Sequence, residues 1–327
     1  MRLIVRPDAV TSAAYVARYI IDRIRTFQPT SEKPFVLGLP TGGSPLAVYE
    51  ILVDAYDAGR VSFEHVITFN MDEYTGLPRD HPESYHSFMF RHLFSRVNIK
   101  PENVHILDGN APDLDEECTR YEAKIKEVGG IELFFGGVGP DGHIAFNEPG
   151  SSLASRTRVK TLAMDTIRAN SRFFNGDIHK VPQMALTVGV QTIMEVSTCY
   201  GLEVVIIANG VTKAVAVQKA IECGVNHMCT LSCLQMHPFS MVVVDEDATL
   251  ELQVKTVKDT QYFKNIEKVG LGRGFEQKIP LRLRSWSLAS PPQTPDSKTQ
   301  DNFDESLVDL TPDNMSSRME SWPVAYT

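Results

Sequence analysis

Three side chains that handle protons lie within eight residues of this chain, at Asp141, His143 and Glu148. The loop that carries them is rich in glycine, which lets a backbone turn sharply and approach a ligand closely. A histidine gives and takes protons near neutral pH, and a neighbouring carboxylate can fix its tautomer. Each of the three alone would be ordinary turn chemistry. Their combination predicts a site of acid–base catalysis.

A second loop predicts an anion site, and it consists of Thr41, Gly42, Gly43 and Ser44. It follows an apolar run and precedes a helix expected over 46–58, with Ser44 as the N-cap and Pro45 in the first turn. Free backbone N–H groups and the helix dipole favour an anion at such a terminus. The loop matches neither the P-loop nor the GxGxxG pattern, so it does not imply a nucleotide.

Further charged side chains follow other apolar runs. Asp72 comes after a strand expected over 66–69, and Lys213 comes after one expected over 203–208. Because the carboxyl ends of parallel strands meet at one edge of a sheet, these side chains and both loops are expected to converge. An anion cradle beside carboxylates and an imidazole suits proton transfer on a small phosphorylated molecule. No nucleophile elbow or HExxH pattern favours a covalent or metal mechanism.

Strands and helices alternate along the chain, which predicts an α/β fold with a doubly wound, mostly parallel sheet. Arg156, Arg158 and Lys160 alternate on a segment whose default interpretation is a solvated edge strand. The charges on the outer face of the 113–128 helix are expected to be solvated. Strands are expected at 2–5, 35–39, 66–69, 104–107, 131–135, 203–208, 241–244 and 250–254, with a return to the sheet at 182–190. Helices are expected at 9–27, 46–58, 82–94, 113–128 and 165–174, and from about 212.

Composition sets the broad class. The chain has 327 residues, 43% of them hydrophobic, and a net charge of −9 with a pI near 5.5, which argues against nucleic-acid binding. Five cysteines without a CxxC pattern form no disulfide framework, and Cys229 and Cys233 are expected to be reduced core residues. The absence of a signal-peptide core and of a long apolar run predicts a cytoplasmic protein with no membrane partner. Residues 1–268 are predicted to form the catalytic domain, and 269–327, rich in Pro, Ser and Thr, a disordered tail.

The motifs DGHIAFNEPGSS at 141–152, LPTGGSP at 39–45 and TFNMDEY at 68–74 resemble the glucosamine-6-phosphate deaminase family. The resemblance covers roughly the first 265 residues. It implies ring opening of glucosamine 6-phosphate by His143 with Asp141 and Glu148, and abstraction of the C2 proton by Asp72. An imine intermediate is then hydrolysed to fructose 6-phosphate and ammonia, without a metal or organic cofactor.

The resemblance also implies binding roles and an assembly. The substrate phosphate is expected at the 41–44 loop, with Arg172 and Lys213. A homohexamer activated by N-acetylglucosamine 6-phosphate is expected, and this overrides the edge-strand default for Arg158 and Lys160. The implied activator residues are Ser151, Ser152, Arg158, Lys160, Thr161 and Tyr262.

The chain departs from the family pattern at several places. Residues 198–202 and 259–261 are extra segments, Cys229 replaces a usual Trp, and the tail does not match.

Two other functions stay open. One is a 6-phosphogluconolactonase-like hydrolase, which also carries a GxDGH loop, and the other is a non-catalytic sugar-phosphate sensor. Asp72 and Glu148 favour the deaminase over the lactonase, because lactone hydrolysis needs no C2 base.

Overall fold

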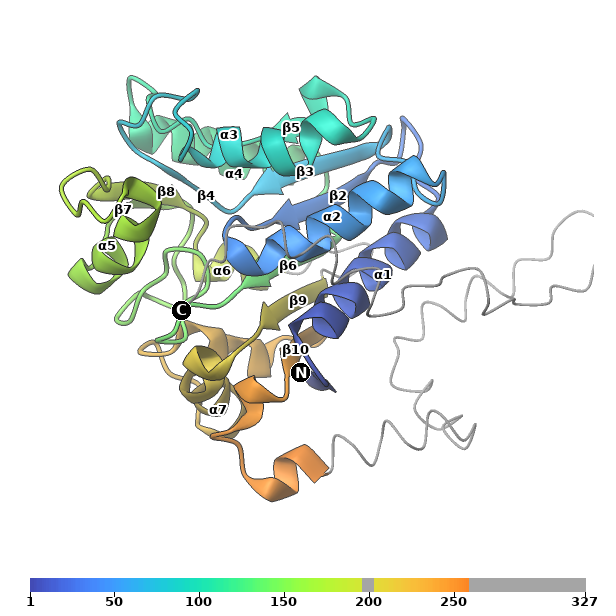
Figure 1. Cartoon of the computed structure of the whole chain (residues 1–327). Helices are drawn as coiled ribbons and strands as arrows, with labels where there is room; N and C mark the ends of the chain where they lie inside the picture. The colour runs from blue at the N-terminus through green and yellow to red at the C-terminus, as the bar shows by residue number, and fades with distance from the viewer. Residues whose placement is uncertain (196–202, 259–327) are drawn as a thin grey trace, which may run out of the picture. The chain divides into compact units, whose positions relative to one another are not determined.

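The structure, a computed structural model, describes residues 1–195 and 203–258, and Met1–Val257 forms one compact unit. Its centre is a seven-stranded sheet in the order β1-β10-β9-β6-β2-β3-β5, in which every neighbouring pair is parallel (Figure 1). The predicted α/β class and doubly wound parallel sheet are confirmed. The strands are β1 (Arg2–Arg6), β2 (Phe35–Leu39), β3 (Val66–Asn70), β5 (Val104–His105), β6 (Leu133–Gly137), β9 (Glu203–Ala208) and β10 (Ser240–Asp245).

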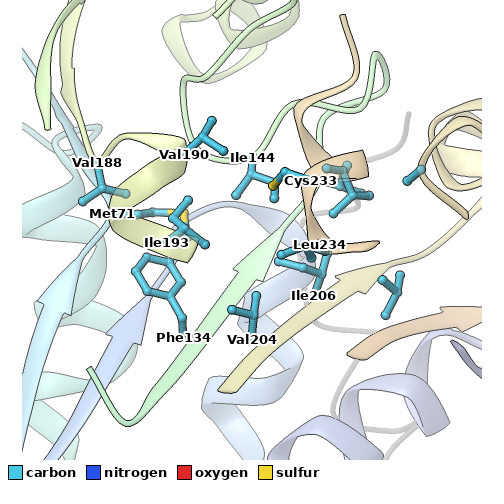
Figure 2. Close-up of a cluster of buried hydrophobic side chains, with 14 of the residues drawn as sticks. Met71, Phe134, Ile144, Val188, Val190, Ile193, Val204, Ile206, Cys233 and Leu234 are labelled. Carbon is cyan, nitrogen blue, oxygen red and sulfur yellow. The ribbon is translucent and has the colours of Figure 1, made fainter. Parts of the chain in front are cut away.

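Helices cover both faces of this sheet, so its strands are apolar on both sides. The ring of Phe135 faces Tyr49 of α2, with ring centroids 6.3 Å apart, whereas Phe134 points to the opposite face. Figure 2 shows Phe134 and Ile206 on the same side of the sheet as Leu234. One face carries α1 (Ala9–Phe27) and α2 (Gly43–Asp57); the other carries α4 (Leu114–Glu127), α6 (Val190–Met194), α7 (Ala214–Glu222) and the 3₁₀ segment η5 (Thr230–Met236).

A second, three-stranded sheet was not predicted. Its strands are β4 (Asp72–Tyr74), β8 (Met184–Thr187) and β7 (Arg158–Thr161), in that order, and both pairs are antiparallel. Its register places Asp72 and Arg158 on either side of Thr187. Together with α5 (Met164–Asn170) and η3 (Ser171–Phe174) it encloses a small core around Tyr74, Phe146 and Phe174. The chain therefore leaves the main sheet directly after β3, and Asp72 lies at the junction of the two sheets.

Two expectations about local structure were wrong. Ser44 is not the N-cap of α2: Gly42 takes that position with φ +108°, so Ser44 and Pro45 both lie in the first turn, where proline is tolerated. Residues 250–254 are not a strand. The Asp245 carboxylate accepts the Ala248 N–H at 2.9 Å and starts a turn after β10, η6 (Asp247–Thr249).

The charges on the outer face of α4, such as Glu116, Arg120 and Lys126, are exposed, as expected, whereas Glu117 lies on its buried face. Glu117 is 4% exposed, accepts the Asp108 N–H at 2.9 Å and pairs with Arg120, so one charge of that helix is buried and partnered. The helix expected over 82–94 is shorter, α3 (Tyr85–His92), followed by η1 (Phe94–Arg96). Cys229 and Cys233 are buried free thiols, as expected. Within the described residues, no helix is long and apolar enough to cross a membrane.

Candidate active site

The candidate site lies where the winding of the main sheet reverses. After β2 the chain adds β3 and β5 on one side, then returns to add β6, β9 and β10 on the other. Such a switch point, at the carboxyl ends of the strands, is where open α/β sheets bind ligands. The consecutive strands β9, β6, β2 and β3 lead into Lys213, the Asp141–His143 loop, the 41–44 loop and Asp72, respectively.

The 41–44 loop leaves the start of α2 open to an anion. Among the described residues, no side chain caps the first turn of α2, and a Cβ added at Gly42 or Gly43 would meet no atom within 4 Å. The φ of +108° at Gly42 is in the region that favours glycine. The buried Tyr49 hydroxyl donates to the Pro40 carbonyl and holds the chain just before the loop. The first N–H groups of a helix have no partner within the helix, and the helix dipole makes this terminus positive, so the loop is suited to bind an anion.

Asp72 is buried, with 6% of its surface exposed, and its Oδ1 has no hydrogen-bond partner among the described residues. Burial, with a smaller contribution from the charge of Glu73, raises the pKa of Asp72 to about 8. The backbone beside it is fixed because the Tyr121 hydroxyl donates to the Asn70 carbonyl at 2.6 Å. A carboxyl group with a pKa near the working pH is suited to act as a general base.

Glu73 has a different task from its neighbour. Its carboxylate accepts the backbone N–H groups of Tyr74, Tyr85 and His86 at 2.8, 3.0 and 2.8 Å, and so ties β4 to the start of α3. Its charge disfavours ionisation of Asp72. Sequence reasoning assigned no role to Glu73, although two consecutive carboxylates at a strand end were a usable signal.

The structure brings Asp141 and His143 together. His143 Nδ1 lies 2.6 Å from Asp141 Oδ1, and the same carboxylate oxygen accepts the His143 backbone N–H at 3.1 Å. Burial raises the pKa of Asp141, but the contacts with His143 outweigh it and leave that pKa below its usual range. Gly139 lies against the imidazole, since a Cβ there would approach His143 Cε1 to 2.2 Å. The ring is therefore confined by the backbone on one side and oriented by a carboxylate on the other.

Glu148 is held by groups other than His143. It is 3% exposed and accepts hydrogen bonds from the Ala163 N–H at 2.8 Å and the Thr166 hydroxyl at 2.6 Å. Lys160 Nζ lies 3.6 Å from its other oxygen. These contacts connect the loop that carries His143 with β7 and with the start of α5, a connection that the spacing of the sequence did not indicate.

Lys213 lies near Asp141, and a second cation, Arg172, lies near Lys213. Lys213 ends the 3₁₀ segment η4 (Val211–Lys213), which begins after a turn at Gly210 with φ +84°. Burial and the charge of Arg172 lower the pKa of Lys213 to about 8, although the negative charge of Asp141 acts in the opposite direction. Arg172, on η3, is exposed. Two neighbouring cations of which one is half-buried would be stabilised by an anion between them.

The expected activator residues are only partly placed. Arg158 is half-buried, and its Nη1 lies 2.9 Å from Asn147 Oδ1. Ser151 Oγ is buried and has no hydrogen-bond partner among the described residues, whereas Ser152 and Thr161 are exposed. Tyr262 and the extra segments at 198–202 and 259–261 lie outside the described residues, as does the tail. In the described ranges, no three His, Cys, Asp or Glu side chains gather as metal ligands.

Comparison with known proteins defines the class to which this arrangement belongs. The model of the family Glucosamine-6-phosphate isomerases/6-phosphogluconolactonase matches residues 7–250. The chain belongs to this family. This finding confirms the fold class and the enzyme family expected from the three motifs.

Individual relatives narrow the comparison. The chain is 59% identical to a glucosamine-6-phosphate deaminase of Aeromonas hydrophila subsp. hydrophila over 273 residues, which are 84% of this chain and 100% of the relative. It is 59% identical to glucosamine-6-phosphate deaminase 2 of Xenopus tropicalis over 82% of this chain and 95% of the relative. A solved monomeric glucosamine-6-phosphate deaminase superposes with a TM-score of 0.72 at 36% identity, covering 77% of this chain and 100% of that one. A 6-phosphogluconolactonase from Thermotoga maritima shares the fold at 19% identity, with a TM-score of 0.55 and coverage of 75% and 99%.

Proposed function

We propose that this protein is a glucosamine-6-phosphate deaminase, which converts D-glucosamine 6-phosphate and water to D-fructose 6-phosphate and ammonia. The observation that carries the proposal is a buried carboxyl group at Asp72, whose Oδ1 has no hydrogen-bond partner among the described residues, at the same edge of the sheet as the Asp141–His143 pair. The relatives named as deaminases at 59% identity support the same function. The net reaction breaks a carbon–nitrogen bond with water and isomerises the sugar, so the enzyme is classed as an isomerising hydrolase.

Binding begins with the phosphate. The open N–H groups of α2 at Gly42, Gly43 and Ser44, with Thr41 beside them, receive the dianion, and Lys213 and Arg172 neutralise it. An anion beside Lys213 stabilises its protonated form, which reverses the effect of burial. The phosphate thereby orients the sugar with its ring toward the acid–base groups.

His143 then opens the pyranose ring. Its imidazole removes the proton of the O1 hydroxyl and returns a proton to O5 as the C1–O5 bond breaks, while Asp141 orients the ring through Nδ1. Glu148 supports the loop that carries His143 through its buried contacts.

Asp72 performs the isomerisation. Its carboxylate takes the C2 proton of the open-chain aldehyde and forms an enolamine, and a proton delivered to C1 produces the C2 imine. Water adds at C2 and the C–N bond breaks, which releases ammonia and the ketose. These steps consist of proton transfers and hydration, which this set of side chains can perform without a cofactor.

The test is a direct assay. Purified protein incubated with glucosamine 6-phosphate is expected to release ammonia and fructose 6-phosphate in equal amounts, and Asp72→Asn is the inactive control. Turnover of 6-phosphogluconolactone in place of the amino sugar would support the lactonase that shares the fold. Binding of glucosamine 6-phosphate without turnover of either compound would support a sensor.

We also propose regulation by N-acetylglucosamine 6-phosphate through Ser151, Ser152, Arg158, Lys160, Thr161 and Tyr262, in a cytoplasmic homohexamer. The buried Ser151 Oγ, which has no hydrogen-bond partner in the described part of the chain, and the half-buried Arg158 support a polar ligand there. Because a three-residue insert precedes Tyr262, coupling is expected to be weak. Saturation curves with and without activator, on this chain and on one lacking residues 259–261, test the coupling. Analytical ultracentrifugation of this protein distinguishes a hexamer from a monomer, which is the state of the structural relative.

A further inference from the structure

We propose that Thr230 is a positioning residue for the catalytic loop, holding the turn between His143 and Glu148 in its working shape. The inference rests on the proposed function, which assigns catalysis to that loop. Thr230 is fully buried, at the start of η5 and far from His143 in the sequence. Nothing in the motifs around residue 141 points to it.

The turn that follows His143 is tight and strained. Ile144 and Asn147 form an isolated antiparallel bridge, with the Asn147 N–H donating to the Ile144 carbonyl at 3.0 Å. Between them Ala145 has φ +51°, a left-handed conformation that non-glycine residues adopt only when the surroundings impose it. This turn sets the separation of His143 from Glu148, so its shape matters for both.

The Thr230 side chain closes the turn from outside. Its hydroxyl donates to the Asn147 carbonyl at 2.8 Å and accepts the Ile144 N–H at 3.2 Å. One hydroxyl thus serves a donor at one end of the turn and an acceptor at the other. Both backbone groups belong to residues with no exposed surface, where an unmade hydrogen bond is costly.

The neighbours of Thr230 extend the same support. The segment 227–231, here called the brace, contacts the catalytic loop on both sides of His143. The Leu231 N–H donates to the Gly142 carbonyl at 2.9 Å, and Cys229 Sγ lies 3.8 Å from the same oxygen. At the far end the Gly150 N–H donates to the His227 carbonyl at 3.0 Å. Thr230 is the member of the brace whose side chain reaches the strained turn.

The chain offers a matched control at Thr192. Its hydroxyl is also buried and donates to a carboxylate, Glu122, but it lies on α6 and that contact does not involve the catalytic loop. Thr230→Val and Thr192→Val each remove one buried hydroxyl without changing the size of the side chain. Thr230→Ser keeps the hydroxyl and is the conservative variant.

The experiment compares these variants on the full chain. Thr230→Val is expected to lower kcat about ten- to a hundredfold with KM for glucosamine 6-phosphate within about threefold, because misplacement of a catalytic group by an ångström slows chemistry on that scale. Thr230→Ser and Thr192→Val are expected to keep wild-type kcat. Ala145→Gly in the Thr230→Val background is expected to recover part of the loss, because glycine adopts this φ without strain.

A second readout does not depend on activity. In ¹⁵N-histidine-labelled protein, the His143 ring signals, assigned with His143→Gln, are expected to shift in Thr230→Val and to stay in place in Thr192→Val. If the wild type is inactive but these signals shift, the proposed function fails and the positioning role stands. Wild-type kcat and unmoved signals in Thr230→Val would overturn the positioning role. Thr230→Ala is used if Thr230→Val does not fold. Failure of both to fold, with Thr192→Val folded, would overturn it in favour of a purely structural residue.

Discussion

Lys160 Nζ lies 3.6 Å from Glu148 Oε2, and this contact joins the edge strand β7 to the loop that carries His143. Glu148 is buried, whereas 27% of the Lys160 side chain is exposed. A ligand that binds Lys160 would therefore act directly on the contact between Lys160 and Glu148, and so on the loop that carries His143.

Lys160→Gln is expected to lower the free energy of unfolding by about 1–3 kcal/mol, because the buried Glu148 loses a charged partner. The loss is smaller than for a fully buried pair, because Lys160 is only partly buried. Lys180→Gln, in the exposed pair with Asp177, is expected to change it by less than about 0.5 kcal/mol. Urea unfolding of both variants checks this. Equal losses in the two would show that the Lys160 contact has no special weight.

Asp72→Asn is expected to retain phosphosugar binding and to lose about 10²–10⁴-fold in kcat, the usual contribution of a general base. A loss below about tenfold would remove Asp72 from that role. Equilibrium binding of glucosamine 6-phosphate and initial rates of ammonia release are the measurements.

The same variant is expected to be more stable at neutral pH. The pKa of Asp72 is about 8 in the folded protein, against the ordinary value of 3.8, so between these values the folded state holds a proton that the unfolded state has released. The contribution of Asp72 to the free energy of unfolding is fully present below about pH 4. It falls, by up to about 1.4 kcal/mol per pH unit, as the pH rises toward 8. Asp72→Asn should flatten that slope in urea titrations between pH 4 and 8.

The pH profile of kcat/KM is expected to be bell-shaped with a maximum near pH 8. Asp72 must ionise, which produces the rising limb, and Lys213 must stay protonated to bind phosphate, which produces the falling limb. Lys213→Arg should remove the falling limb, because an arginine stays charged throughout this range. A falling limb that persists in this variant would assign it to another group.

His143→Gln is expected to slow ring opening more than enolisation, because only the first step needs the imidazole. A substrate analogue held in the open-chain form should therefore escape much of the defect. Rates for the cyclic and open-chain compounds are compared in wild type and variant. Equal losses on both would contradict the assignment.

Gly139→Ala is expected to displace the His143 ring and to lower both kcat and stability, the latter by about 1–3 kcal/mol, as overpacking does. Gly137→Ala is the control for stability, because its Cβ would meet no atom of the described residues within 4 Å. Thermal unfolding and initial rates distinguish the two. Unchanged kinetics in Gly139→Ala would show that the ring moves aside freely.

The sequence by itself determined the elements whose signals are local. The helix over Ala9–Phe27 was predicted with its observed bounds, because apolar residues recur along one face. The structure adds that Asp8 caps its start. The parallel direction of the strands in the main sheet followed from the alternation of strands and helices, and parallel strands bring their carboxyl ends to one edge. The meeting of Asp141 with His143 follows from their spacing of two residues in one loop.

Only the tertiary structure decided the second sheet and what depends on it. β4 pairs with β8, more than a hundred residues away, and short antiparallel partners so far apart leave no local pattern. The contact of Lys160 with Glu148 and the bonds of Thr230 to Ile144 and Asn147 likewise join segments that are remote in the chain. The raised pKa of Asp72 has the same origin, because burial is a property of the packed molecule and not of the residue.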